Sequence, residues 1–140
     1  RNDSGRLLNE ELQVVIESLP NYEILGHTAV NNEFILFFKV GTSSEIGTFT
    51  KEVGYTKIFS DAALSYKLNF TNDIDCTGRI VGSISDPAKS TTSIGDRVVY
   101  FVEKGQKPRR FNLDEYIYDN TNYNDNIFKN IYYLIYVIIF

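Results

Sequence analysis

The sequence predicts an all-β protein, either an antiparallel sandwich or a propeller-like repeat of β-hairpins. Two observations predict this class: a strand–turn–strand pattern that occurs twice, and many short apolar runs separated by turn residues. The composition agrees, because 43% of the residues are hydrophobic and the chain contains ten Phe and ten Tyr. Aromatic residues suit the pleated, half-buried surface of a sheet.

The duplicated pattern covers Glu33–Phe49 and Arg97–Leu113. Each copy is strongly apolar at first, turns at a glycine and resumes as a shorter, half-polar strand. Phe38 and Phe101 occupy matching places 63 positions apart. We expect both copies to be hairpins whose apolar sides form the core. The predicted core residues are Phe34, Leu36, Phe38, Val98, Tyr100 and Phe111.

The first half of the chain contains most of the predicted strands. Residues 1–9 are polar, and Glu10–Leu19 fits both a helical stripe and a strand, with its β-branched residues favouring a strand. Asn31-Asn32 is typical of a hairpin turn, because Asn tolerates a positive φ. The strand before this turn is Tyr22–Val30, and the strands predicted after it are Glu33–Val40, Glu45–Thr50, Tyr55–Phe59 and the alternating run Tyr66–Phe70. Glu33–Val40 is apolar on both faces, so we expect it to lie in the interior of a sheet.

The second half adds three predicted strands and one long loop. Cys76–Ile84 is a candidate strand in which Gly78 and Gly82 could mark bulges. Ser85–Asp96 has no apolar periodicity, which indicates a long surface loop. Arg97–Glu103 and Arg109–Leu113 are the strands of the second copy.

The chain divides into a predicted all-β domain over residues 1–115 and a separate segment over residues 116–140. This segment begins as a low-complexity mixture of Tyr, Asn, Asp and Ile. It ends in the apolar run Ile131–Phe140, which fits either the start of a membrane helix or a β-strand. The chain contains no Met and stops inside this run. We therefore expect it to be part of a longer protein.

Candidate chemical groups are few. His27 is the only histidine and Cys76 the only cysteine, so neither a His-based metal cluster nor an internal disulfide can form. Asp73 and Asp75 could ligate a hard cation, but they lack the other residues of a calcium loop. We assign no catalytic, cofactor-binding or metal-binding residues and expect a protein that is not an enzyme. The net charge of −4 argues against nucleic-acid binding by broad phosphate neutralisation.

One basic cluster occurs, at Lys104–Arg110. Its glycine and proline predict a charged hairpin turn between the two strands of the second copy. The cluster could also bind phosphates or the acidic surface of a partner protein. We predict that it is a contact between subunits, together with the Ser85–Asp96 loop. The residues predicted to make the contact are Lys104, Gln106, Lys107, Arg109 and Arg110.

The order of several motifs resembles a known family. The motifs are NDSGRLLNE, SLPNYEILGHT, SEIGTF, LNF followed by CTGRI, and RVVYFVEKGQKPRRFNLDE. This order resembles the tail-assembly proteins of crAss-like bacteriophages of gut Bacteroidota, called stabilisation or muzzle proteins and related to tubular tail nozzles. In that family an aromatic strand is followed by a turn of the Asn-Pro-Pro-Arg type. Pro108 and Arg109 match that turn, whereas Glu103-Lys104-Gly105 replaces the usual Asp-Gly before it.

The resemblance covers residues 1–115 and implies a function. Members of the family are virion structural proteins that are not enzymes. They form a ring at the tail exit and guide DNA or ejected proteins through its lumen. The net negative charge of this chain is compatible with a channel through which DNA slides without binding. The resemblance therefore implies a homo-oligomer that contacts neighbouring tail proteins in the virion, with no small-molecule substrate, cofactor or membrane.

The sequence also allows two other functional classes. The first is an extracellular β-module that binds carbohydrate or a cell-surface ligand through exposed Tyr and Asn loops; it would need several exposed aromatic residues on one concave face. The second is a small hydrolase, which is disfavoured because no acid–base pair can be assembled from the sequence.

Overall fold

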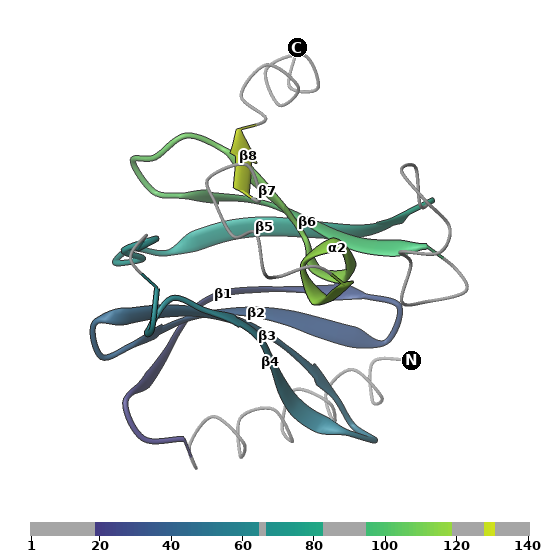
Figure 1. The fold of residues 1–140 in the computed structure, drawn as a ribbon, viewed down its shortest axis with the longest axis horizontal. Helices are drawn as coiled ribbons and strands as arrows, with labels where there is room; N and C mark the ends of the chain where they lie inside the picture. Colours follow the sequence, from purple (N-terminus) through teal and green to yellow (C-terminus); the bar gives the residue numbers. More distant parts are fainter. Residues whose placement is uncertain (1–18, 65–66, 83–94, 119–127, 131–140) are drawn as a thin grey trace. The chain divides into compact units, whose positions relative to one another are not determined.

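The all-β class is confirmed by the computed structural model, which describes residues 19–64, 67–82, 95–118 and 128–130 (Figure 1). The regular structure in these ranges consists of eight strands and one six-residue helix. The chain forms two compact units, residues 1–71 and residues 72–140. Each unit contains one four-stranded antiparallel sheet, which is consistent with an all-β sandwich. The predicted strand at Glu10–Leu19 and the apolar run Ile131–Phe140 lie outside the described residues, apart from Leu19.

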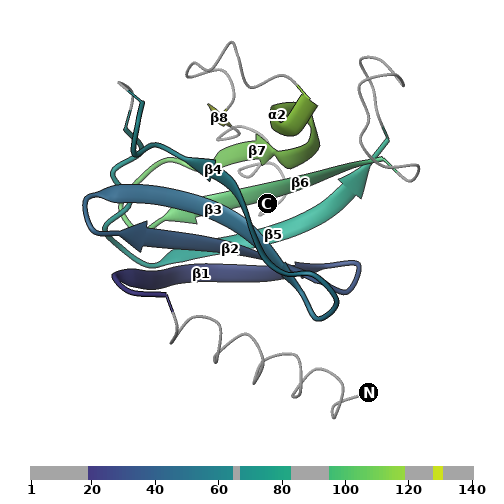
Figure 2. The ribbon, with the colours of Figure 1, turned by 60° about the horizontal axis from the view of Figure 1, so that its bottom comes forward.

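The sheet of the first unit is a meander in which each strand pairs with the next along the chain (Figure 2). Its strands confirm the four predicted between residues 22 and 60, with ends that differ by at most two residues. They are β1 (Tyr22–Val30), β2 (Glu33–Val40), β3 (Ser43–Thr50) and β4 (Gly54–Ser60).

The β1–β2 turn has the predicted asparagine geometry. Asn31 and Asn32 have φ values of 48° and 63°. Two consecutive positive φ values define the two-residue type I′ turn, whose twist matches that of the strands it joins. The next turn, between β2 and β3, contains Gly41 with φ of 62°. Both hairpins are therefore closed by residues that accept the left-handed region.

β2 lies inside the sheet and is buried on both faces, as its sequence predicts. Residues 34–38 are all buried, with at most 9% exposure. Phe34, Leu36 and Phe38 pack with Phe49 on one face. On the other face Phe37 makes an edge-to-face contact with Phe70, with ring centroids 6.0 Å apart. Full burial of each such side chain contributes about 1.5–3 kcal/mol, so the buried residues of β2 contribute substantially to the core of this unit.

The strand predicted at Tyr66–Phe70 is wrong for residues 67–70, and Tyr66 lies outside the described residues. No strand occurs at 67–73, although Leu68 and Phe70 are buried and Lys67 and Asn69 are exposed, as the alternation predicts. The backbone donors bind side chains instead of a neighbouring strand. The amide of Leu68 donates to Asp61 Oδ2 at 2.9 Å, and that of Phe70 to Ser44 Oγ at 2.9 Å. Asn69 has φ of 56°, which a regular strand excludes.

The sheet of the second unit is also a meander. β5 covers Ile74–Val81, somewhat earlier than the predicted Cys76–Ile84. No bulge occurs at Gly78, which pairs with Val99 in an unbroken register. The second copy of the repeat supplies the next two strands, β6 (Asp96–Glu103) and β7 (Arg109–Asn112), and β8 (Phe128–Asn130) completes the sheet.

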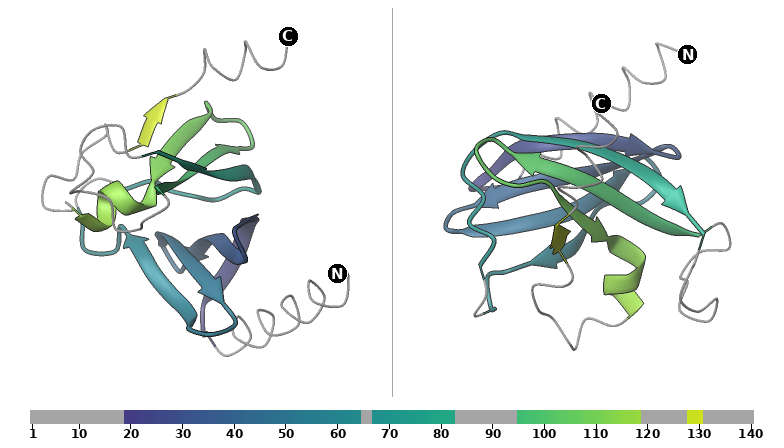
Figure 3. Two further views of the ribbon diagram at one scale, coloured as in Figure 1. Left: turned by 90° about the vertical axis from the view of Figure 1, so that its right-hand side faces the viewer. Right: turned by 90° about the horizontal axis from the view of Figure 1, so that it is seen from above.

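A short helix, α2 (Leu113–Tyr118), follows β7 where the sequence predicts the end of a strand and a change of composition (Figure 3). Asn112 caps it, because its Oδ1 accepts a hydrogen bond from the Glu115 amide at 2.9 Å. α2 spans the boundary predicted after residue 115, and β8 belongs to the predicted 116–140 segment. The division at that boundary stays a prediction.

The two copies of the repeat are both hairpins, β2–β3 and β6–β7. Phe38 and Phe101 are buried on the first strand of each, and Phe49 and Phe111 are buried on the second. The loops differ, with two residues in the first hairpin and five in the second. The core prediction is confirmed for five of its six residues. Tyr100 is only half-buried.

Candidate functional site

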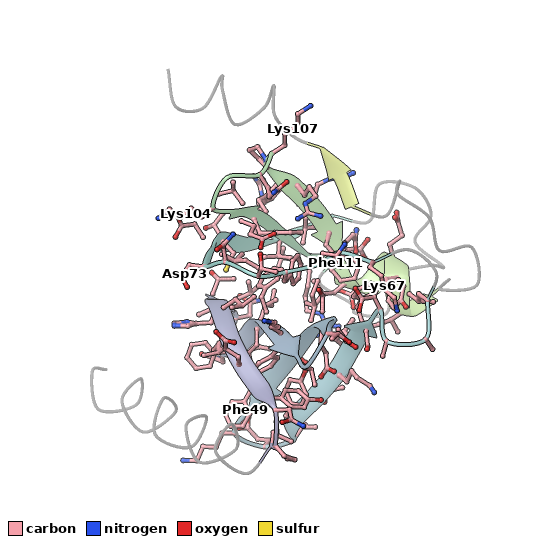
Figure 4. All side chains as sticks on the ribbon, turned by 90° about the vertical axis from the view of Figure 1, so that its left-hand side faces the viewer. Phe49, Lys67, Asp73, Lys104, Lys107 and Phe111 are labelled. Carbon is pink, nitrogen blue, oxygen red and sulfur yellow. The ribbon has the colours of Figure 1, made fainter. Side chains whose placement is uncertain are left out.

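The basic turn (Lys104–Arg110) joins β6 to β7, so the predicted hairpin turn is confirmed. Lys104, Gln106 and Lys107 are exposed, whereas Arg109 and Arg110 are half-buried. Figure 4 shows Lys104 and Lys107 with their side chains pointing outward from the turn. The turn therefore presents two ammonium groups and one amide to solvent.

Backbone hydrogen bonds hold the first half of the turn. The amide of Lys104 donates to the carbonyl of Asp73 at 3.1 Å, and the amide of Gln106 donates to the carbonyl of Glu103 at 2.8 Å. Gly105 has φ of 87°, a conformation that glycine adopts without strain. The backbone beneath the exposed side chains is thus fixed at two points.

Arg109 anchors the second half of the turn. Its guanidinium lies 5.1 Å from the ring centroid of Phe101 and 3.9 Å from Glu103 Oε1. Glu103 is 3% exposed, and its Oε2 accepts a hydrogen bond from the Asn72 amide at 2.9 Å. A cation over an aromatic face and beside a carboxylate is held in one position. Arg109 therefore supports the turn from below.

Arg110 faces the other side of the sheet. Side chains alternate along a strand, and Arg110 lies opposite Tyr100 whereas Arg109 lies opposite Phe101. The five residues predicted as a contact thus divide into an exposed tip (Lys104, Gln106, Lys107) and two arginines on opposite faces at its base. The predicted strand at Arg109–Leu113 already implies that the two arginines lie on opposite faces, but their neighbours on β6 follow only from the β6–β7 register.

The other sequence candidates lie apart from the turn or at its edge. His27 is exposed on β1 and contacts Phe34 edge to face at 5.9 Å, as expected of a residue on a sheet surface. Asp73 and Asp75 are exposed, and Asp75 lies within β5 rather than in a loop. Cys76 is half-buried, and burial, with a smaller effect of Asp75, raises the pKa of its thiol to about 12. Of the predicted Ser85–Asp96 contact loop, only Gly95 and Asp96 lie within the described residues.

A buried carboxylate that sequence reasoning missed lies on β3. Glu45 is 3% exposed and accepts hydrogen bonds from the hydroxyls of Tyr22, at 2.9 Å, and Tyr55, at 2.7 Å. Burial first, and then the hydrogen bond to Glu45, raise the pKa of Tyr22 to about 12 and that of Tyr55 further. Phe38 packs edge to face against both tyrosine rings. The three polar residues come from β1, β3 and β4, so no local motif could have revealed the group.

A second missed group is the ion pair between Arg97 and Asp114. The guanidinium donates to both carboxylate oxygens, at 3.1 and 2.8 Å, and the Arg97 amide donates to the same side chain at 2.6 Å. Asp114 is fully buried. The pair joins β6 to α2 and thus has a structural role.

A shallow hollow of about 260 Å³ lies on β5 and β6. The register places Asp75 opposite Val102 and Thr77 opposite Tyr100 on one face, with Cys76 and Phe101 paired between them. Its lining is mostly apolar. Among the residues that the structure describes, no group of three or more His, Cys, Asp or Glu could hold a metal ion. The one described helix is too short to cross a membrane.

No protein-family model, curated protein or solved structure matches the chain.

Proposed function

We propose that this chain is a structural component of a bacteriophage tail that acts by assembly rather than by catalysis. In this proposal copies of the chain form a ring at the tail exit and line part of the conduit for DNA or ejected proteins. The phage assignment comes from the motif order over residues 1–115. The assembly mechanism is supported by the basic turn.

The main support for assembly is that the base of the turn is held in place whereas its tip is exposed. Arg109 is held by Glu103 and Phe101, while Lys104, Gln106 and Lys107 are exposed. A fixed backbone loses little conformational entropy on binding, which favours a rigid docking element. Exposed lysines on a fixed loop suit an acidic partner surface.

The partner that fits this tip is another copy of the same chain. The chain carries a net charge of −4, so the rest of its surface complements a local positive tip. A contact between a tip and a different patch on the next subunit is heterologous, and such contacts form a ring when the rotation between subunits closes. The basic turn therefore supports a ring of identical subunits.

The carbohydrate alternative receives no specific support from the described residues. Every phenylalanine whose side chain is described is buried, and every such tyrosine is half-buried. The large apolar side chains that are exposed are Val53 and Ile117. A sugar-binding face would need aromatic rings accessible to solvent.

The test compares Lys107→Glu with Lys57→Glu, which changes the charge equally at an exposed position on β4. We expect the wild type to self-associate in sedimentation velocity, and Lys107→Glu to weaken that association about tenfold or more. Lys57→Glu should behave as the wild type. If Lys107→Glu and Lys57→Glu associate equally strongly, the basic turn is not part of the interface. A wild type that stays a 16.1 kDa monomer would overturn the ring.

A further inference from the structure

β5 is an edge strand that lacks several of the features that protect edge strands. In the described residues it pairs with β6 alone (Figure 3). Its eight residues contain no proline and no lysine, and their register with β6 has no bulge. Edge strands usually carry such features to prevent pairing with another chain. Their absence makes β5 a template for a further strand.

β5 also carries two opposite charges that cannot neutralise each other within one chain. Asp75 and Arg79 are both exposed and, four residues apart, lie on the same face of the strand. Their Cα atoms are about 13 Å apart at the usual rise of a strand. Neither side chain forms an ion pair within the part of the chain that the structure describes. Thr77 lies midway between them.

We propose that two copies of this chain pair through their β5 strands, antiparallel and related by a two-fold axis at Thr77. In this register Asp75 lies opposite the partner's Arg79, and Arg79 lies opposite the partner's Asp75. On the other face, Ile74 lies opposite the partner's Ile80 and Cys76 opposite the partner's Gly78. The sequence from Ile74 to Ile80 is thus complementary to itself, as a two-fold contact requires.

Other registers fit less well. An axis at Asp75 or at Arg79 places identical charges opposite each other, which destabilises cross-strand pairs. An axis at Cys76 leaves Asp75 opposite the partner's Thr77, and it leaves Ile80 opposite the partner's Asn72, outside β5. Charge complementarity and the number of paired residues therefore both select Thr77.

This contact goes beyond the proposed ring. The β5 contact joins the same strand of two copies, whereas the basic turn of one copy contacts a different patch on the next copy. The two contacts are experimentally separable. Lys107→Glu should weaken only the turn contact, so the β5 contact is measured in that background.

Charge reversal tests the pairing. Asp75→Arg places two arginines opposite each other, and Arg79→Asp places two aspartates opposite each other. We expect each variant alone to dimerise at least tenfold more weakly in sedimentation velocity, with unchanged circular dichroism. An equimolar mixture of the two should form heterodimers as tightly as the parent, because both charged cross-strand pairs are then opposite in charge. The double variant with both reversals should dimerise as the parent does. Unchanged dimerisation of the single variants, or no association in the mixture, would overturn the proposal.

Cysteine cross-linking tests the register. In a Cys76→Ser background, Thr77→Cys places two thiols side by side on the axis, where a disulfide can form. Asp75→Cys is the matched control, because its two thiols would lie about 13 Å apart. We expect mild oxidation to produce covalent dimers of the first variant only. Equal cross-linking of the control, or efficient cross-linking of the wild type through Cys76, would contradict the Thr77 axis.

Discussion

The ring of Tyr55 on β4 lies directly over Gly47 on β3, in the space that a side chain at position 47 would occupy. From there the tyrosine hydroxyl reaches Glu45 Oε2 at 2.7 Å. The glycine therefore makes room for the ring, and the ring position satisfies a buried carboxylate. This relationship links β3 and β4 through both packing and hydrogen bonding.

Gly47→Ala should destabilise the protein by about 1–3 kcal/mol, because the new methyl group displaces a packed ring. Urea unfolding followed by circular dichroism measures the loss. Gly82→Ala is the matched control, since a Cβ there meets no atom within 4 Å. It should change the free energy of unfolding by less than about 0.5 kcal/mol. Equal stability of the two variants would show that Tyr55 moves aside without cost.

We expect Tyr22 and Tyr55, which bind Glu45, to lower the free energy of unfolding at high pH. The pKa of Tyr22 is raised from 10.0 to about 12 in the folded protein, so folding favours the protonated hydroxyl. This contribution is fully present below pH 10 and is lost as the pH rises through about 12. We expect Tyr22→Phe to reduce the fall in unfolding free energy between pH 9.5 and pH 11.5, as measured by urea titration. An identical slope in the variant would contradict this role, and Tyr100→Phe on β6 serves as the control.

Asp61 replaces a strand as the partner of two backbone amides. It is fully buried, and its oxygens accept from Ser44 and Leu68 at 2.8 and 2.9 Å. Asp61→Ala leaves both amides unpaired and should cost about 2–6 kcal/mol, because each buried, unsatisfied donor costs about 1–3 kcal/mol. Asp73→Ala, at an exposed side chain, should be nearly neutral in the same thermal or urea unfolding experiment. A small effect at Asp61 would mean that water replaces the carboxylate.

How far the sequence predicts this fold depends on how local each signal is. The strands between Tyr22 and Phe59 follow from short apolar runs and from the turns between them, such as Asn31-Asn32, which involve neighbouring residues. The run at Tyr66–Phe70 has the right alternation, but its partners are side chains distant in sequence. The helix α2 was missed although Asn112 and the acidic residues after it form a capping signal. The Glu45 group depends on the register of four strands, which no single segment encodes.

The asparagine turn gives a further test of local chemistry. Asn32 has φ of 63°, a region that costs a β-branched residue about 1–2 kcal/mol. Asn32→Val should therefore lower the free energy of unfolding by about this amount, whereas Asn32→Gly should leave it unchanged or slightly higher. Thermal unfolding of the two variants provides the measurement. A tolerated valine would indicate that the hairpin adopts another turn.

The central claim is that this chain works by assembling with copies of itself through charged contacts. Sedimentation velocity of the wild-type chain over a wide concentration range, at low and at high salt, tests it most directly. We expect species larger than the 16.1 kDa monomer at micromolar concentration, and weaker association as salt screens the contacts. A single monomeric species at every concentration and salt level would contradict the claim.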